Sequence, residues 1–187
     1  MAVDQRQLQQ PRRAGASMSH SKGSHPTRRL MLMRHAKSDW NDPSLSDFQR
    51  PLNRRGQQAI PVMAKWLEQQ GEKVDAILAS EATRARQTVE GMIENLDWRG
   101  AVFWRQELYL APPATLIAEI IQIPNSVQSL LLVAHNPGLE QMVAHWSGNW
   151  QPFPTAAIAI FEFQGESWEE AIGRMPLCVA IGKPKEL

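Results

Sequence analysis

Residues 30–37 read Leu-Met-Leu-Met-Arg-His-Ala-Lys, and this stretch decides the fold class of the 187-residue chain. Four apolar residues followed at once by polar ones predict a buried strand that ends by presenting Arg34 and His35. Residues 130–138, Leu-Leu-Leu-Val-Ala-His-Asn-Pro-Gly, repeat the pattern and present His135. Ligands of open α/β sheets bind at the carboxyl ends of the strands. Two strand-end histidines accompanied by arginines therefore suggest phosphoryl chemistry.

Strands and helices alternate along the chain, which predicts a three-layer αβα sandwich with a mostly parallel sheet. We expect strands at 29–33, 76–79, 101–104 and 130–134. We expect helices between Asn53, which can cap the first, and Gly71, then over 85–96, 115–121 and 138–146. Residues 157–163 and 168–172 flank Gln-Gly-Glu-Ser at 164–167, a pattern that predicts a hairpin at the sheet edge.

The amino-terminal segment has a composition unlike the rest of the chain. Residues 1–29 carry a net charge of +5 and the remainder −4, within a total of +1. The segment is rich in Gln, Ser, Gly and Pro and has no apolar pattern, which favours a disordered basic leader over residues 1–28, ahead of a single domain at 29–187. Contact with nucleic acid or an anionic surface is the alternative interpretation of this charge, and we prefer the leader.

Composition narrows the setting in which the chain works. A single cysteine, Cys178, excludes an intramolecular disulfide and fits a reducing compartment. The sequence has neither an apolar stretch of about 18 residues, the length that spans a bilayer, nor the apolar core of a secretory signal. We therefore expect a cytoplasmic protein that binds neither membrane nor nucleic acid. No His, Cys and Asp cluster has metal-ligand spacing, so we expect no metal and no cofactor.

Three segments, each behind a predicted strand, resemble the histidine phosphatase superfamily. They are Arg-His at 34–35, Ser-Glu-Ala-Thr-Arg-Ala-Arg-Gln-Thr at 80–88, and His-Asn-Pro at 135–137. The start Arg-His-Ala-Lys-Ser at 34–38 and the segment Arg-Pro-Leu-Asn at 50–53, with Gly56, are similar to the SixA-like phosphohistidine phosphatases. The resemblance covers residues 30–162 and implies a compact phosphoglycerate-mutase-like fold without a large lid insertion.

The resemblance implies a catalytic set of four residues. His35 is the expected nucleophile, since a neutral imidazole with an ordinary pKa of about 6.5 can attack phosphorus and form a phosphohistidine intermediate. Arg34 and Arg84 are expected to bind the nonbridging phosphoryl oxygens, because a guanidinium matches phosphate geometry and keeps its charge. His135 is expected to donate to another phosphoryl oxygen.

Other polar residues near the motifs receive different interpretations. Asn41 follows His35 by six residues, a spacing at which an asparagine binds phosphate in the mutase-like branch, and a turn asparagine is an equal alternative. Arg86 is interpreted as a surface or helix-pair arginine. His145 stands within a predicted helix without a motif and is interpreted as structural.

No acidic residue matches a general-acid motif. Glu107 lies near the region where larger relatives carry their acid, and Asp39, Asp42 and Asp47 lie in the loop after the first strand. Phosphohistidine has a better leaving group than a phosphate ester, so an enzyme acting on it needs no strong acid. We therefore expect a phosphatase for phosphohistidine on a protein, such as a phosphorelay or phosphotransfer domain. A small-molecule phosphomonoesterase is the first alternative, and a noncatalytic phosphate-binding scaffold is the second.

Overall fold

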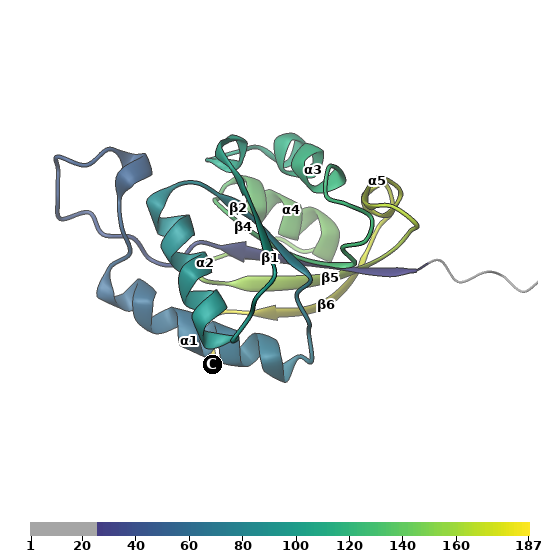
Figure 1. Ribbon diagram of the computed structural model, residues 1–187, viewed down its shortest axis with the longest axis horizontal. Helices are drawn as coiled ribbons and strands as arrows, with labels where there is room; N and C mark the ends of the chain where they lie inside the picture. The colour runs from purple at the N-terminus through teal and green to yellow at the C-terminus, as the bar shows by residue number, and fades with distance from the viewer. Residues whose placement is uncertain (1–25) are drawn as a thin grey trace, which may run out of the picture.

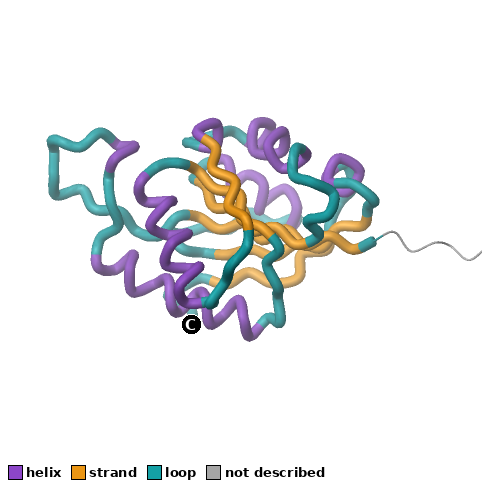
Figure 2. Tube along the Cα trace, in the orientation of Figure 1, coloured by secondary structure: helices purple, strands orange, loops and turns teal. Residues whose placement is uncertain are grey.

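The computed structural model describes residues 26–187 and places six strands in one sheet (Figures 1 and 2). The strands are β1 (Thr27–Arg34), β2 (Ala76–Ser80), β3 (Ala101–Arg105), β4 (Ser129–Ala134), β5 (Ile158–Gln164) and β6 (Leu177–Gly182). Their order across the sheet is β3-β2-β4-β1-β5-β6. The first four strands pair in parallel, whereas β5 runs antiparallel to both β1 and β6. The mostly parallel sheet expected from the sequence is confirmed.

Helices cover both faces of this sheet. They are α1 (Arg54–Gln69), α2 (Thr83–Asn95), α3 (Pro113–Ile121), α4 (Gly138–Ser147) and α5 (Trp168–Ile172). Side chains alternate between the faces of a strand, so Met31 and Met33 pack with α1 and α2, while Leu30 and Leu32 pack with α3, α4 and α5. Figure 1 shows the same two groups of helices on opposite sides of the sheet. The three-layer arrangement explains why the central strands are apolar along their length.

The segment 36–53, between β1 and α1, forms a long loop that projects beyond the carboxyl end of β1 (Figure 1). Backbone contacts close its neck: Asp39 donates to Pro51 at 2.8 Å, and Asn53 donates to Lys37 at 2.9 Å. A short 3₁₀ helix, η1 (Asp47–Gln49), lies on the returning arm, and residues 40–44 at the tip are exposed. The neck is therefore anchored to the domain, while the tip extends into solvent.

The start of α1 packs directly on the first residues of this loop. Asn53 caps the helix as expected, because its side-chain oxygen accepts from the Gly56 N–H at 2.9 Å. A Cβ atom at Gly56 would lie 2.2 Å from the Lys37 carbonyl oxygen, so only glycine allows this approach. The helix ends before Gly71, whose φ of +72° is the left-handed conformation typical of a helix terminus.

The hairpin expected over 157–172 is wrong. Residues 168–172 form helix α5, with Ser167 as its cap accepting from the Glu170 N–H. The antiparallel partner of β5 is instead β6, which pairs with β5 from Ile158 to Glu162. A cap residue followed by two acidic residues in the first turn favours a helix, and this local signal outweighs the turn-like residues at 164–167.

The domain also begins earlier than expected. Strand β1 starts at Thr27, so Thr27 and Arg28 belong to the domain and not to the leader. The Arg28 side chain is 2% exposed and donates to the carbonyl oxygens of Gly165 at 3.1 Å and Val127 at 2.9 Å. A buried arginine whose partners are distant backbone carbonyls leaves no pattern in the local sequence. Pro26 is also described, and its carbonyl accepts from the Gly165 N–H at 3.1 Å, whereas residues 1–25 of the predicted leader lie outside the described residues.

Candidate active site

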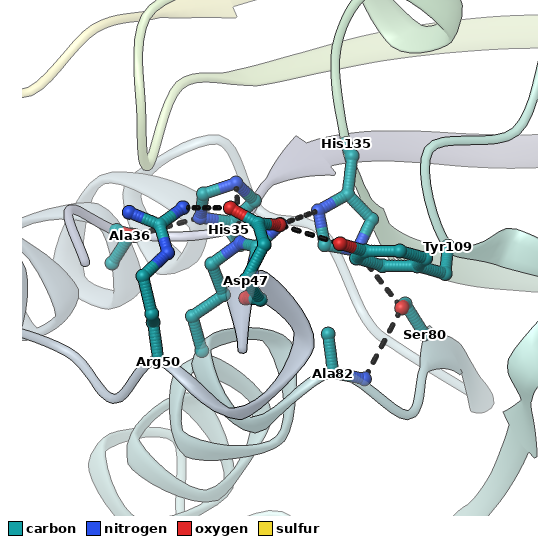
Figure 3. A network of polar contacts seen from close by, with 9 residues as sticks. His35, Ala36, Asp47, Arg50, Ser80, Ala82, Tyr109 and His135 are labelled. Carbon is teal, nitrogen blue, oxygen red and sulfur yellow. Dashed lines mark hydrogen bonds and ion pairs between the residues drawn. The ribbon is translucent and has the colours of Figure 1, made fainter. Parts of the chain in front are cut away.

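The carboxyl ends of β1, β4 and β2 lie side by side, because these strands are neighbours and run parallel. Arg34 pairs with Ala134 at the last register position, so His35 and His135 follow directly on adjacent strands. Their ring centroids are 4.9 Å apart. Ser80 ends β2, and Arg84 lies in the first turn of the following helix, α2. Sheet order therefore converts three separate sequence motifs into one cluster (Figure 3).

The backbone holds His35 in one tautomer. Its Nδ1 lies 2.8 Å from the Ala36 carbonyl oxygen, which can only accept, so Nδ1 carries the proton and Nε2 has the free lone pair. The Ala36 N–H in turn donates to Thr88 Oγ1 at 3.0 Å, and this hydroxyl donates to the Arg84 carbonyl at 2.6 Å. Thr88 therefore fixes the position of the segment that orients the imidazole.

Electrostatics keep His35 neutral. The ring is 7% exposed, and burial lowers its pKa to about 3, with the positive charges of Arg84, Arg34 and Arg50 adding to the effect against the Ala36 hydrogen bond. Nε2 is therefore unprotonated throughout the neutral pH range. An unprotonated ring nitrogen beside fixed cations is suited to attack a phosphorus atom whose oxygens carry negative charge.

Arg84 is the central cation of the cluster. Its side chain is 2% exposed, and its Nε donates to His35 Nε2 at 3.2 Å. Its Nη2 lies 3.0 Å from Asp47 Oδ2 and 3.2 Å from His135 Nδ1. One guanidinium therefore contacts both histidines and a carboxylate. Its several N–H donors could likewise bind more than one oxygen of a single anion.

His135 is also neutral and has a hydroxyl partner. It is 1% exposed, and burial lowers its pKa to about 2, with the charges of neighbouring Arg84 and Arg34 acting in the same direction. Its Nε2 lies 2.8 Å from Ser80 Oγ. With Arg84 donating to Nδ1, Nε2 carries the proton and donates to Ser80. A hydroxyl can also donate, so Ser80 can support the opposite tautomer, in which Nδ1 donates to a ligand oxygen.

Arg34, the last residue of β1, directly precedes His35 and carries a second guanidinium. Its Nη1 donates to the Phe153 carbonyl at 2.9 Å, and the Asn136 side-chain amide donates to the same oxygen at 3.0 Å. The Arg34 Nε is buried and has no hydrogen-bond partner among the described residues. A buried, unpaired N–H is available to an oxygen of a bound anion.

Three residues without a predicted role complete the cluster. Asp47 in η1 accepts from Arg50 Nη2 at 2.5 Å and from the Tyr109 hydroxyl at 2.5 Å, in addition to Arg84. Arg50 is 7% exposed and stacks on Trp40, with its Cζ 3.2 Å from the ring centroid. Tyr109 follows η2 (Gln106–Leu108) behind β3, which is the fourth parallel strand. Its position shortly after a parallel strand could have indicated that Tyr109 lies near the site. The path of the loop that brings Asp47 and Arg50 there could not be predicted from the sequence.

Four of the five predicted site residues come together, and Asn41 does not. Asn41 is exposed in the loop, where its backbone N–H donates to Asp39 Oδ1 at 2.9 Å and closes a turn formed by the Asp39 side chain. Glu107 is exposed in η2. Arg86 lies away from the cluster, over the Trp104 ring at 4.4 Å, and His145 is exposed on α4.

Two negative findings concern only residues 26–187. Within this range, no group of three or more His, Cys, Asp or Glu side chains is arranged to hold a metal ion. None of the helices formed by these residues has the length and apolar character needed to cross a membrane.

The cluster places an unprotonated histidine nitrogen beside buried arginine side chains, an arrangement that can bind an anion, and sequence comparison identifies the class of protein that carries it. Residues 30–105 match the family model of the histidine phosphatase superfamily (branch 1). A Mycobacterium tuberculosis protein without an assigned function is 36% identical over 160 residues, which cover 80% of this chain and 96% of that protein. The chain belongs to the histidine phosphatase superfamily.

Further relatives have assigned activities or structures. The phosphohistidine phosphatase SixA of Escherichia coli is 29% identical over 134 residues, covering 70% of this chain and 82% of that protein. A structure of the protein histidine phosphatase SixA complexed with tungstate is 25% identical with a TM-score of 0.71, covering 84% of this chain and 98% of the other. A phosphoglycerate mutase of Bacillus anthracis has the same fold, with a TM-score of 0.66 at 12% identity, covering 87% of this chain and 96% of the other. The phosphoglycerate-mutase-like fold is therefore confirmed.

Proposed function

We propose that this phosphatase hydrolyses phosphohistidine on a protein, such as a phosphorelay or phosphotransfer domain, through a covalent intermediate on His35. One observation carries the proposal: the unprotonated Nε2 of His35 lies 3.2 Å from the buried guanidinium of Arg84. The similarity to SixA of Escherichia coli and to the tungstate-bound SixA structure supports phosphohistidine as the substrate class. Tungstate is a tetrahedral oxyanion, as phosphate is.

The reaction has two displacements at phosphorus. In the first, the Nε2 lone pair forms a bond to phosphorus while the bond from phosphorus to the substrate ring nitrogen breaks, and that nitrogen keeps the electron pair. In the second, a water oxygen forms a bond to phosphorus, the bond to Nε2 breaks, and inorganic phosphate leaves with one proton released to solvent. Because Nδ1 keeps its proton on the Ala36 carbonyl, His35 departs as a neutral imidazole.

The arginines and His135 act on the phosphoryl oxygens. Arg84 must release Nε2 when phosphorus approaches, and its N–H groups then bind the nonbridging oxygens, together with the unpaired Nε of Arg34. Fixed donors in a water-poor site stabilise the charge that these oxygens carry in the transition state. When Ser80 donates to Nε2 of His135, Nδ1 can donate to another oxygen.

The leaving group favours phosphohistidine over an alkyl ester. Burial raises the pKa of Asp47, but hydrogen bonding by Tyr109 and the charges of Arg84 and Arg50 outweigh it and hold the pKa below its ordinary value. Asp47 is therefore ionised at neutral pH and has no proton to donate to an alkoxide. A histidine ring whose second nitrogen is protonated leaves as neutral imidazole and needs no acid. The proposal accordingly assigns the chain a phosphorylated protein partner in the cytoplasm.

A small-molecule phosphomonoesterase is the alternative on the same scaffold. The observation that favours it is the location of the Asp47 carboxyl group, 3.0 Å from the guanidinium of Arg84 and therefore beside the reacting atoms. If Asp47 took up a proton during turnover, it would serve as a general acid for an ester.

Trapping of the covalent intermediate tests the nucleophile. A phosphohistidine protein with radioactive phosphate is mixed with enzyme and quenched in alkali within milliseconds, because phosphohistidine survives alkali and is labile to acid. We expect alkali-stable label on the wild-type enzyme and none on His35→Ala, while His145→Ala, which alters an exposed histidine on α4, labels like wild type. Equal labelling of the His35→Ala enzyme would remove His35 from this role.

A further inference from the structure

The Asp47 carboxylate has the donor set of an oxyanion. Oδ2 accepts from Arg84 Nη2 at 3.0 Å and from the Tyr109 hydroxyl at 2.5 Å, while Oδ1 accepts from Arg50 Nη2 at 2.5 Å. Two guanidinium groups and one hydroxyl thus converge on a single carboxylate, which Figure 3 shows between Arg50 and Tyr109. Arg84 is also the residue that contacts the His35 nucleophile. An anion bound to this Arg84 edge and the Asp47 carboxylate must therefore use the same donors.

Burial divides these residues into fixed donors and a movable acceptor. The side chains of Arg84 and Arg50 are 2% and 8% exposed, whereas that of Asp47 is 40% exposed. Asp47 belongs to the loop 36–53, whose neck is anchored by backbone hydrogen bonds while residues 40–44 at the tip are exposed. Arg84 Nη1 also donates to the Asp47 carbonyl oxygen at 2.5 Å, so a rotation of the half-exposed side chain, and not a displacement of the loop, would carry the carboxylate toward solvent while the donors remain in the protein.

Arg50 has unused binding capacity at this position. Its Nε and Nη1 are both buried and lack a hydrogen-bond partner among the described residues, and Trp40 covers the flat face of the guanidinium. Buried N–H groups without partners are rare because each costs free energy, and these two are available to the oxygens of a ligand. Tyr109 can also donate a hydrogen bond at this position. Burial and the neighbouring Asp47 raise the pKa of its hydroxyl, which therefore keeps its proton.

We propose that Asp47 is an internal competitor of the substrate phosphoryl group, and that Arg50 and Tyr109 bind phosphoryl oxygens when Asp47 moves out. The inference rests on the proposed function, since it assigns further residues to the same phosphoryl site. It extends that site from the predicted arginines and histidines to a third arginine and a tyrosine. Asp47 thereby sets the affinity of the site for a phosphoryl group and for the product, inorganic phosphate.

Calorimetric titration with inorganic phosphate at pH 7.5 and fixed ionic strength tests the competition. We expect Asp47→Ala to bind phosphate about tenfold more tightly than wild type, since the charge-assisted hydrogen bonds to the carboxylate no longer have to be broken. Asp42→Ala is the matched control, because the exposed Asp42 carboxylate of the same loop bonds, within residues 26–187, only to Ser44, and this variant should leave the affinity unchanged. Equal affinity of Asp47→Ala and wild type would overturn the competition.

Double variants test the two added donors. In the Asp47→Ala background, Arg50→Gln should weaken phosphate binding roughly tenfold and Tyr109→Phe about threefold, because each removes a donor to a phosphoryl oxygen. If these residues serve only to hold Asp47, neither change affects phosphate binding once Asp47 is gone, and that result would overturn their assignment. Tyr109→Phe keeps the volume of the ring, so it tests whether the Tyr109 hydroxyl binds phosphate even if Arg50→Gln fails to fold.

The outcomes also separate this inference from the proposed function. If wild type binds phosphate and labels on His35 but Asp47→Ala binds no more tightly, the phosphatase assignment stands and the competition is wrong. If neither wild type nor Asp47→Ala binds phosphate, the phosphoryl site itself is misassigned and both fail. If Asp47→Ala leaves phosphate affinity unchanged and lowers kcat most for esters with poor leaving groups, Asp47 is a general acid and not a competitor.

Discussion

The hydroxyl of Ser80 lies 2.8 Å from Nε2 of His135, at the carboxyl ends of the adjacent strands β2 and β4. The same Oγ accepts from the Ala82 N–H at 3.3 Å, at the start of α2. Ser80 therefore links His135 to the helix that carries Arg84. This contact makes Ser80 a positioning residue, because its hydroxyl can accept from or donate to Nε2 and so holds the His135 ring in either tautomer.

Replacement of Ser80 by Ala should lower kcat about fivefold to tenfold, since the hydrogen bond that holds the His135 ring and supports the tautomer with a protonated Nδ1 is lost. The ¹⁵N chemical shifts of the His135 ring report the tautomer directly, and they should change in Ser80→Ala. Ser44→Ala, an exposed serine of the loop, should alter neither quantity. Unchanged ring shifts would show that Ser80 does not determine the tautomer.

The stability of the protein should fall as the pH is lowered below about 6.5. The pKa of His35 is about 3 in the folded protein and about 6.5 in the unfolded chain, so between these values the unfolded chain binds more protons. For His35 alone, the expected loss of unfolding free energy at pH 5 is about 2 kcal/mol relative to pH 7 or above. His135, whose pKa is lowered to about 2, should contribute in the same direction.

Urea unfolding between pH 7.5 and 4.5 measures this dependence. His35→Gln should flatten the pH dependence, whereas His145→Ala, which changes an exposed histidine, should preserve it. A His35→Gln protein as acid-sensitive as wild type would mean that His35 is not held neutral by burial.

The rate should depend steeply on the leaving group. General acid catalysis contributes about 10²–10⁴ in rate, so an enzyme without an available acid should be slow on alkyl phosphates and faster on aryl phosphates and phosphohistidine. Glu107→Gln should leave phosphohistidine turnover unchanged, since Glu107 is exposed in η2. Steady-state kinetics over a series of phosphate esters checks both statements. A flat dependence on leaving-group pKa that disappears in Glu107→Gln would favour the phosphomonoesterase alternative.

Deletion of residues 1–25 should leave the melting temperature and turnover unchanged. The composition of this segment provides no apolar pattern that could add to a core. Calorimetry and activity of the shortened chain test this expectation. A loss of several degrees, or of most activity, would show that the segment packs on the domain.

Arg28 should behave in the opposite way. Arg28→Met removes donors from the Gly165 and Val127 carbonyls, and leaving buried carbonyls unpaired should lower the free energy of unfolding by about 2–3 kcal/mol. Arg99→Met, at a side chain that is 87% exposed, is the control and should have little effect. Equal stability of the two variants in urea unfolding would contradict the structural role of Arg28.

Some features of this protein follow from local sequence alone. The apolar runs before Arg34 and His135 indicate buried strands because both faces of such a strand must be covered. Strand-end placement then brings His35, His135 and Arg84 to one edge, and this grouping was correctly expected. Asn53 and Gly71 bound the first helix for equally local reasons, since capping and left-handed backbone depend on single residues.

Other features depend on contacts between residues far apart in the chain, which no local pattern encodes. Tyr109 reaches Asp47 across 62 positions, and Arg84 reaches it across 37, because the loop after β1 returns over the carboxyl ends of the strands. The sequence predicted a hairpin between residues 157–163 and 168–172. Instead, β5 pairs with β6, which follows α5 in the chain and forms the edge of the sheet. Sequence therefore determined which residues we propose for the phosphoryl chemistry, and only tertiary structure decided that Asp47 lies beside them, because a loop's path is set by packing and not by periodicity.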